Sequence, residues 1–214
     1  MSPFGLAAFT KSVAALEDLP ESEAEIAFAG RSNAGKSSAL NALAHRQRLA
    51  FVSKTPGRTQ LINFYRVGER QFLVDLPGYG YARVPPATRA AWESLLGGYL
   101  QTRAPLRGMV LIMDIRHPLT ELDQRMLAWF SPTGKPVHVL LTKADKLSRA
   151  AATATLQKVR RDLLRFGAGV TAQLFSSLKK SGLEEAEKRC AAWLSAQLAR
   201  KNDPAEIKSP GLKG

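Results

Sequence analysis

Short hydrophobic runs alternate along the chain with longer stretches in which apolar residues recur every three to four positions. The short runs predict strands, and the longer stretches predict helices. The predicted strands are 25–30, 60–67, 70–75, 108–114, 136–142 and 170–175, and the predicted helices are 36–45, 86–103, 120–130, 148–166 and 182–201. Gly68 and Glu69 separate two strands by a hairpin turn. We therefore expect an α/β fold whose six-stranded, mostly parallel sheet has one antiparallel strand and helices on both faces.

The domain organisation follows from where this pattern begins and ends. We expect an acidic N-terminal appendage over 1–22, a single domain over 23–202 and a flexible tail over 203–214, which contains two prolines. Cys190 is the one cysteine, which excludes an internal disulfide. The N-terminus lacks the basic region of a signal peptide, and no apolar run reaches the roughly 18 residues of a membrane helix. We expect a cytoplasmic monomer without membrane contact.

The charge of the chain is unusual and uneven. Lysine and arginine number 31 against 18 acidic residues, a formal net charge of +13. Residues 146–170 contain six bases and one acid, and residues 26–60 contain six bases and no acid. Such a field attracts phosphate polyanions, although a merely solvated basic surface is the alternative interpretation. No base-reading motif accompanies the charge, so charge alone indicates non-specific attraction to nucleic acid.

A phosphate-binding loop is predicted between the first strand and the first helix. Residues 30–37 spell GRSNAGKS, which fits GxxxxGKS in the strand-to-helix context that this motif requires. Its backbone N–H groups can surround a phosphate, Lys36 can reach the β- and γ-phosphates, and the Ser37 hydroxyl can coordinate Mg²⁺. The candidate nucleotide-binding residues here are Gly30, Arg31, Ser32, Asn33, Ala34, Gly35, Lys36, Ser37 and Ser38, with Lys36 also a candidate catalytic residue.

A second motif, DxxG, stands at the end of the strand 70–75 and consists of Asp75, Leu76, Pro77 and Gly78. A carboxylate at the end of a buried strand needs a compensating partner. We expect Asp75 to hold Mg²⁺ through a water molecule. The backbone N–H of Gly78 would contact the γ-phosphate, which makes Gly78 a candidate catalytic residue.

Two further strand ends predict a guanine site. Thr142, Lys143, Ala144 and Asp145 form TKxD, and Asp145 can accept hydrogen bonds from guanine's ring N1–H and exocyclic amine. Adenine lacks both donors there, which argues against an ATP-using protein. Phe175, Ser176 and Ser177 end the last predicted strand and can bring backbone N–H groups to the guanine O6.

The segment FVSKTPGRT, residues 51–59, lies where a first switch loop must sit. A threonine of that loop can complete Mg²⁺ coordination when the γ-phosphate is present. Thr55 and Thr59 both qualify by chemistry.

With these motifs the chain resembles the EngB family of bacterial GTP-binding proteins. The stretches that carry the resemblance are GRSNAGKSSALNAL (30–43), KTPGRTQLINFY (54–65), DLPGYGYARV (75–84), DIRHPLTELD (114–123), LTKADKL (141–147) and FSSLKKSG (175–182). The resemblance implies that Thr59 is the switch ligand of Mg²⁺ and a catalytic residue, and that Gly57, Arg58, Thr59, Gln60 and Leu61 lie at the nucleotide. It also implies GTP hydrolysis, action in assembly of the large ribosomal subunit with ribosomal RNA as partner, and a role in bacterial growth and division.

Two positions bear on turnover. Tyr79 follows Gly78, at the position where many small GTPases carry a glutamine that orients the attacking water. We therefore expect the protein to hydrolyse GTP slowly in the absence of a partner. Asn33 either binds K⁺ beside the phosphates, as in related GTPases with asparagine there, or braces the loop through its amide. The main alternative to a GTP switch is a constitutive RNA- or ribosome-binding module with a vestigial nucleotide site.

Overall fold

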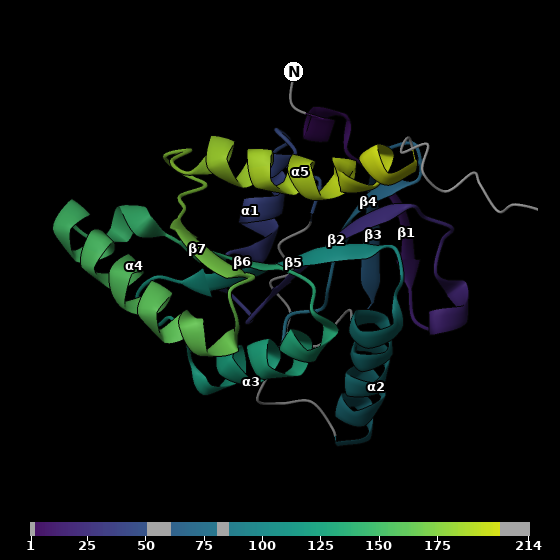
Figure 1. The fold of residues 1–214 in the computed structure, drawn as a ribbon, viewed down its shortest axis with the longest axis horizontal. Coiled ribbons are helices and arrows are strands. Elements are labelled where there is room, and N and C mark those ends of the chain that lie inside the picture. The colour runs from purple at the N-terminus through teal and green to yellow at the C-terminus, as the bar shows by residue number, and fades with distance from the viewer. Residues whose placement is uncertain (1–2, 51–60, 81–85, 202–214) are drawn as a thin grey trace, which may run out of the picture.

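A seven-stranded sheet forms the centre of the molecule (Figure 1). The computed structural model describes residues 3–50, 61–80 and 86–201. The strands are β1 (Ala8–Val13), β2 (Ala24–Gly30), β3 (Ile62–Gly68), β4 (Gln71–Asp75), β5 (Leu106–Asp114), β6 (Val137–Thr142) and β7 (Val170–Leu174), in the spatial order β1-β3-β4-β2-β5-β6-β7. β3 is antiparallel to its neighbours β1 and β4, and the remaining described pairs are parallel.

Helices cover both faces of this sheet, as the sequence predicted (Figure 1). One face carries α1 (Lys36–Leu43) and α5 (Leu183–Lys201), and the other carries α2 (Pro86–Thr102), α3 (Glu121–Phe130) and α4 (Arg149–Leu163). The short 3₁₀ helices are η1 (Pro3–Leu6), η2 (Leu16–Asp18), η3 (Ser131–Thr133), η4 (Ala144–Lys146) and η5 (Leu164–Phe166). Across the described ranges, no helix has the length and apolarity needed to cross a membrane.

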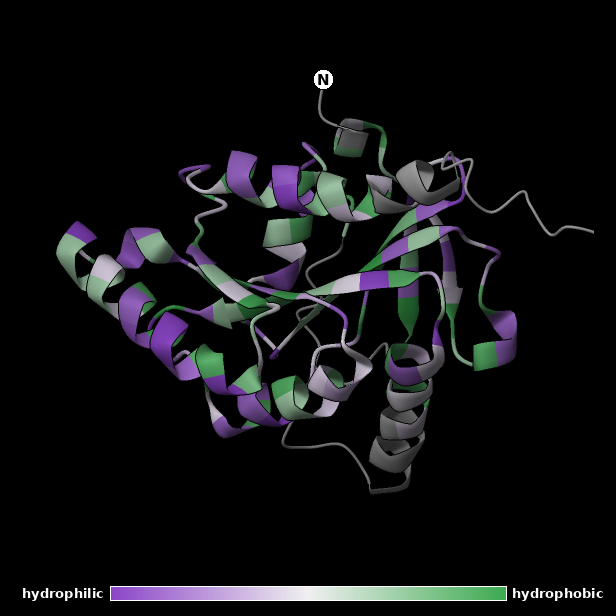
Figure 2. Ribbon diagram, viewed as in Figure 1, coloured by the Kyte–Doolittle hydropathy of each residue, from purple (hydrophilic) through white to green (hydrophobic). Residues whose placement is uncertain are grey.

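The core has two halves because successive side chains of each strand point to opposite faces. On β2, Ile26 and Phe28 pack with α1 and α5, whereas Ala27 and Ala29 pack with the helices of the other face. The same alternation runs through β5 and β6. Figure 2 shows these central strands as largely hydrophobic and α4 as carrying repeated hydrophilic residues.

The sequence prediction of six strands was one short. The segment 1–22, which we expected to be an appendage, contributes the edge strand β1 to the sheet. Residues 8–11 are all exposed, so β1 lacks the in-and-out pattern that identifies a half-buried strand. It forms by backbone pairing with β3. The hairpin turn between β3 and β4 falls at Glu69 and Arg70, one residue beyond the predicted pair.

A buried carboxylate marks the end of the sheet opposite the predicted site. Glu25 lies at the start of β2 and is fully buried. Its carboxylate accepts hydrogen bonds of 2.7 Å from the Tyr99 hydroxyl and 2.7 Å from the Ser22 hydroxyl. It also forms an ion pair of 2.5 Å with the Arg103 guanidinium. These contacts join α2 and the segment before β2 to the sheet, and they compensate the desolvated charge.

A buried histidine joins β6 to the edge strand β7. The Nε2 atom of His138 lies 2.8 Å from Gln173 Oε1, and its Nδ1 atom lies 2.8 Å from Thr171 Oγ1. The Gln173 amide nitrogen donates to the Gly182 carbonyl at 2.6 Å, which leaves its oxygen to accept from Nε2–H of a neutral imidazole. Burial lowers the pKa of His138 from 6.5 to about 4, against the opposing effect of the Gln173 contact.

This pKa predicts a loss of stability in acid. Between pH 6.5 and about 4 the unfolded chain binds a proton at His138 that the folded chain does not, so the free energy of unfolding falls as pH falls through that window. The full effect corresponds to about 3 kcal/mol. Urea unfolding between pH 7 and 4 should show a steeper loss in the wild type than in His138→Gln. Parallel pH curves for the two proteins would contradict the assignment.

Candidate nucleotide site at the carboxyl ends of the strands

The sequence motifs lie at one edge of the sheet. GxxxxGKS follows β2, DxxG follows β4, TKxD follows β6, and the FSS stretch follows β7. These strands are parallel neighbours or separated by β5, so their carboxyl ends meet where ligands of α/β sheets bind. The described members of the candidate site therefore come from four separate loops on one side of the molecule.

The loop between β2 and α1 has the backbone geometry of an anion-binding turn. Asn33 and Gly35 adopt left-handed φ values of 63° and 99°, and Gly35 directly precedes the first residue of α1, Lys36. A Cβ atom on Gly30 would lie 2.8 Å from the carbonyl oxygen of Ile112, so the loop can leave the sheet here only with glycine. Backbone N–H groups arranged in this way can receive a phosphate.

The side chains of Lys36 and Asp75 contact each other at the carboxyl ends of the central strands. The Lys36 ammonium contacts the Asp75 carboxylate, whose residue is 7% exposed. A residue of the phosphate-binding loop thus supplies a compensating charge for this buried carboxylate. The contact also brings the DxxG motif within side-chain reach of α1, where Ser37 follows Lys36.

Two residues of TKxD tie the end of β6 to the same loop. The Thr142 hydroxyl lies 2.5 Å from the Ala34 carbonyl oxygen and 3.0 Å from that of Met113. The Lys143 ammonium donates to the Asn33 carbonyl oxygen at 2.8 Å. The candidate guanine loop and the candidate phosphate loop are therefore held together by direct contacts.

Asp114 was not among the residues predicted from the sequence, yet it ends β5 at this edge and is 6% exposed. Its carboxylate pairs with the Lys143 ammonium at 2.9 Å and accepts hydrogen bonds of 2.9 and 2.6 Å from the Arg116 guanidinium. The Arg116 contact, aided by Lys143 and opposed by burial, holds the pKa of Asp114 well below its usual range. An acid after a buried strand was the same signal that identified Asp75, so the sequence did contain the indication.

The loop after β7 holds Asp145 in place. The Ser176 hydroxyl donates to Asp145 Oδ1 at 2.5 Å and accepts from the Lys179 backbone N–H at 3.1 Å. The Ala144 N–H donates to the Phe175 carbonyl at 3.1 Å. The Ser176 hydrogen bond is the main cause of the lowered pKa of Asp145. Asp145 is thus an oriented, ionised acceptor, which suits a ligand with paired N–H donors.

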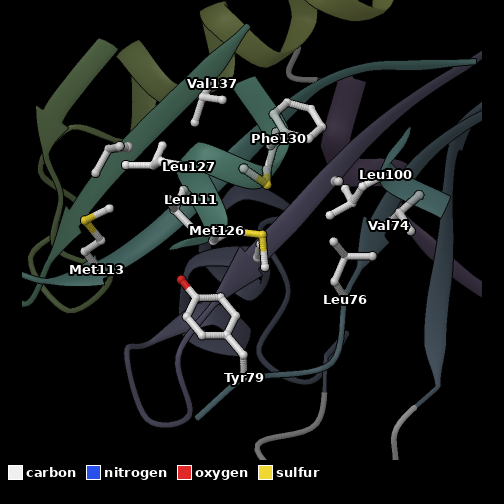
Figure 3. Packing of buried hydrophobic residues seen from close by; sticks show 14 of the residues in the cluster. Val74, Leu76, Tyr79, Leu100, Leu111, Met113, Met126, Leu127, Phe130 and Val137 are labelled. Carbon is white, nitrogen blue, oxygen red and sulfur yellow. The ribbon is translucent and has the colours of Figure 1, made fainter. Parts of the chain in front are cut away.

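Tyr79 does not face this site. Its ring is 5% exposed and packs in the core among residues such as Met126 and Leu76 (Figure 3). Its hydroxyl donates to the buried Asp123 carboxylate at 2.8 Å. Burial, followed by the charge of Asp123, raises the pKa of Tyr79 well above its usual value.

Part of the predicted site lies outside the described residues. These positions are Thr55, Gly57, Arg58, Thr59 and Gln60. Leu61, the last predicted residue of that stretch, is half-buried and directly precedes β3.

Comparisons with known proteins give the family. Residues 25–143 match the family described as "50S ribosome-binding GTPase". A relative in Thiobacillus denitrificans, "Probable GTP-binding protein EngB", is 61% identical over 191 residues, covering 89% of this chain and 92% of the relative. Its counterpart in Aromatoleum aromaticum is 58% identical over 215 residues, covering 99% of this chain and 100% of the relative.

Solved structures agree on the fold. The crystal structure of a probable GTP-binding protein EngB aligns with a TM-score of 0.64 at 19% identity, covering 81% of this chain and 100% of that one. The selenocysteine-specific elongation factor EF-Sec aligns with a TM-score of 0.61 at 18% identity, covering 82% of this chain and 29% of that one. At such identities these likenesses show the P-loop GTPase fold alone. The long, close sequence matches show more: this chain belongs to the EngB family of GTP-binding proteins and is a GTPase.

Proposed function

We propose that the protein is a GTP-controlled switch that acts on the large ribosomal subunit during its assembly in the bacterial cytoplasm, and thereby supports growth and division. Two features support the proposal. The nucleotide edge is assembled from loops that contact one another directly, and the second half of α4 carries the exposed basic residues Lys158 and Arg161. The matching family is itself described as binding the 50S ribosome.

The phosphate end of the nucleotide is assigned to the loop after β2. Lys36 would leave Asp75 for the β- and γ-phosphates, and the N–H of Gly78 would contact the γ-phosphate. The hydroxyl of Ser37 and, through water, the carboxylate of Asp75 are the hard oxygen donors that Mg²⁺ prefers. The ion would offset charge on the phosphates when bound. Thr59 remains the proposed switch ligand.

The base end is assigned to the loops after β6 and β7. Asp145, oriented by Ser176, would accept from guanine N1–H and its amine. Lys143 would lie along the base, with its ammonium held by Asp114 and the Asn33 carbonyl. Discrimination against adenine follows because a buried acceptor without its donors costs binding free energy.

Slow isolated turnover is part of the proposal. Tyr79 is buried and bonded to Asp123, so its hydroxyl is directed away from the place where a glutamine would orient water. The side chain of Asn33 is exposed and makes no hydrogen bond within the described residues. This favours the proposed K⁺ contact beside the phosphates over a loop-bracing amide.

The base assignment predicts a change of nucleotide preference in Asp145→Asn. The substituted amide can donate to the 2-oxo group of xanthine but loses one acceptor for guanine, so affinity should shift from GDP towards xanthosine diphosphate. Competition between the two diphosphates for a fluorescent nucleotide measures the shift. Full retention of GDP affinity by the variant would show that the base lies elsewhere.

The ribosomal part of the proposal is tested by nucleotide-dependent binding. Purified large subunits should co-sediment more of the wild-type protein with a non-hydrolysable GTP analogue than with GDP, because a switch presents different surfaces in its two states. Equal co-sedimentation in both states would favour the alternative, a constitutive ribosome-binding module. No co-sedimentation in either state would remove the ribosomal partner from the proposal.

Helix α4 offers the best-defined cationic face for RNA. Arg160 donates from Nε to the Ala172 carbonyl at 3.0 Å, and Arg165 donates to Gln124 Oε1 at 2.6 Å. Both arginines are exposed but have partners within the fold, and Arg165 lies in η5, directly after α4. Lys158 and Arg161 are exposed, lie three residues apart on one helix face, and have no hydrogen-bond or ion-pair partner in the described part of the chain.

Charge reversal at Lys158 and Arg161 should weaken ribosome binding without changing nucleotide affinity. For each RNA phosphate that the variant no longer neutralises, the magnitude of the log–log salt slope should fall by roughly 0.7 to 0.9. Long-range attraction by the remaining charge should leave some binding. The measurement is co-sedimentation of the double glutamate variant across a salt titration, with GTP-analogue affinity determined in parallel.

The matched control reverses Arg46 and Arg48, which are also exposed and lie beyond α1. This pair has the same change in net charge, so a generic charge effect would weaken both variants alike. Selective weakening in the Lys158 and Arg161 variant supports α4 as the docking face. Selective weakening in the Arg46 and Arg48 variant would transfer the docking face to that segment.

A further inference from the structure

A buried carboxylate on α3 collects contacts from three segments. Asp123 is fully buried. Its Oδ1 accepts from the Tyr79 hydroxyl at 2.8 Å, and its Oδ2 accepts from the Thr120 backbone N–H at 3.0 Å and the Thr120 hydroxyl at 2.7 Å. The Nε atom of Arg31 lies 3.5 Å from the same Oδ2. The three hydrogen bonds make such a charge tolerable in the interior, and the Arg31 guanidinium adds a longer ion-pair contact without a hydrogen bond.

Two of these contacts come from the nucleotide edge. Arg31 is the second residue of the phosphate loop, and Tyr79 directly follows Gly78 of DxxG. The backbones of the two segments are also paired, because the Tyr79 N–H donates to the Gly30 carbonyl at 3.3 Å and the Tyr79 carbonyl accepts from the Ser32 N–H at 3.1 Å. The phosphate loop and the DxxG turn therefore converge on one carboxylate.

We propose that Asp123 is a positioning residue for GTP. Through Tyr79 and Arg31 it fixes the separation between the phosphate loop and the N–H of Gly78, the group assigned to the γ-phosphate. A diphosphate does not reach that N–H, so this arrangement selectively favours the triphosphate state. The inference rests on the proposed nucleotide site and is independent of the ribosomal partner.

A purely structural role for Asp123 predicts a different effect of removing the Tyr79 hydroxyl. Asp123 forms a capping box at the start of α3: its carboxylate accepts from the Thr120 backbone N–H, and its own backbone N–H donates to the Thr120 side chain. That capping box would be sufficient to begin the helix. If Asp123 served only this cap and the core, removing the Tyr79 hydroxyl would lower stability and leave the preference between GTP and GDP unchanged.

The opposite end of the sheet supplies a matched control. Tyr99 is also buried, and its hydroxyl donates to a fully buried carboxylate, that of Glu25, at 2.7 Å. Glu25 is the second residue of β2, whereas the phosphate loop starts at the last residue of β2, Gly30. Tyr79→Phe and Tyr99→Phe thus remove the same chemical group from the same kind of contact, one near the nucleotide and one far from it.

The experiment measures dissociation constants of fluorescent GDP and of a non-hydrolysable fluorescent GTP analogue, with thermal unfolding midpoints. In Tyr79→Phe the preference for the GTP analogue over GDP should fall by about tenfold, the size expected for one hydrogen bond to a charged group. GDP affinity should stay near that of the wild type. Tyr99→Phe should lose thermal stability to a similar extent while keeping the wild-type preference.

A conservative variant separates geometry from charge. In Asp123→Asn the amide oxygen can still accept from Thr120 and the amide nitrogen can donate to the Tyr79 oxygen, so most of the preference should return relative to Asp123→Ala. A wild-type preference in Tyr79→Phe, or an equal reduction in Tyr99→Phe, would overturn the proposal even if Asp123→Ala fails to fold. Failure of the wild type to bind either nucleotide would instead refute the proposed site.

Discussion

Burying a carboxylate is costly unless donors surround it, and this constraint organises the molecule. Among the described residues four acids are buried: Glu25, Asp75 and Asp114 near the ends of strands, and Asp123 on α3. Each has at least one partner from a distant segment of the chain, namely Tyr99 for Glu25, Lys36 for Asp75, Lys143 for Asp114 and Tyr79 for Asp123. A donor from a distant segment fixes how that segment and the one with the carboxylate lie relative to each other. Thus the same contacts that make the charges tolerable also determine where the loops of the nucleotide edge stand.

At that edge the pairing has a functional consequence. Lys36 contacts Asp75 and Lys143 contacts Asp114, so both cations assigned to the nucleotide are held by carboxylates. Each contact holds its lysine side chain at the edge in the absence of a ligand. Anionic phosphates can then compete for Lys36, whereas Lys143 can stay bonded to the Asn33 carbonyl and Asp114 while its stem lies along a base.

Most of the fold could be predicted from the sequence because its strands are buried on both sides and give strong apolar runs. The motif positions followed equally well, since GxxxxGKS, DxxG and TKxD each stand directly after a strand. The predictions failed where an element depends on a pairing partner that is distant in the sequence. The exposed strand β1 forms through backbone pairing with β3, which lies about 50 residues further along the chain, so its own residues give no strand pattern.

Tyr79 shows the same limit at the site itself. From its position after Gly78 the sequence indicated a residue that could not replace a glutamine, which is a statement about what the side chain lacks. Its burial depends on a carboxylate 44 positions further along the chain. A phenol is large enough to reach that carboxylate through the core and polar enough to compensate it. The tyrosine at this position therefore has two effects: DxxG lacks a water-orienting amide, and its Tyr79 hydroxyl joins the segment to α3.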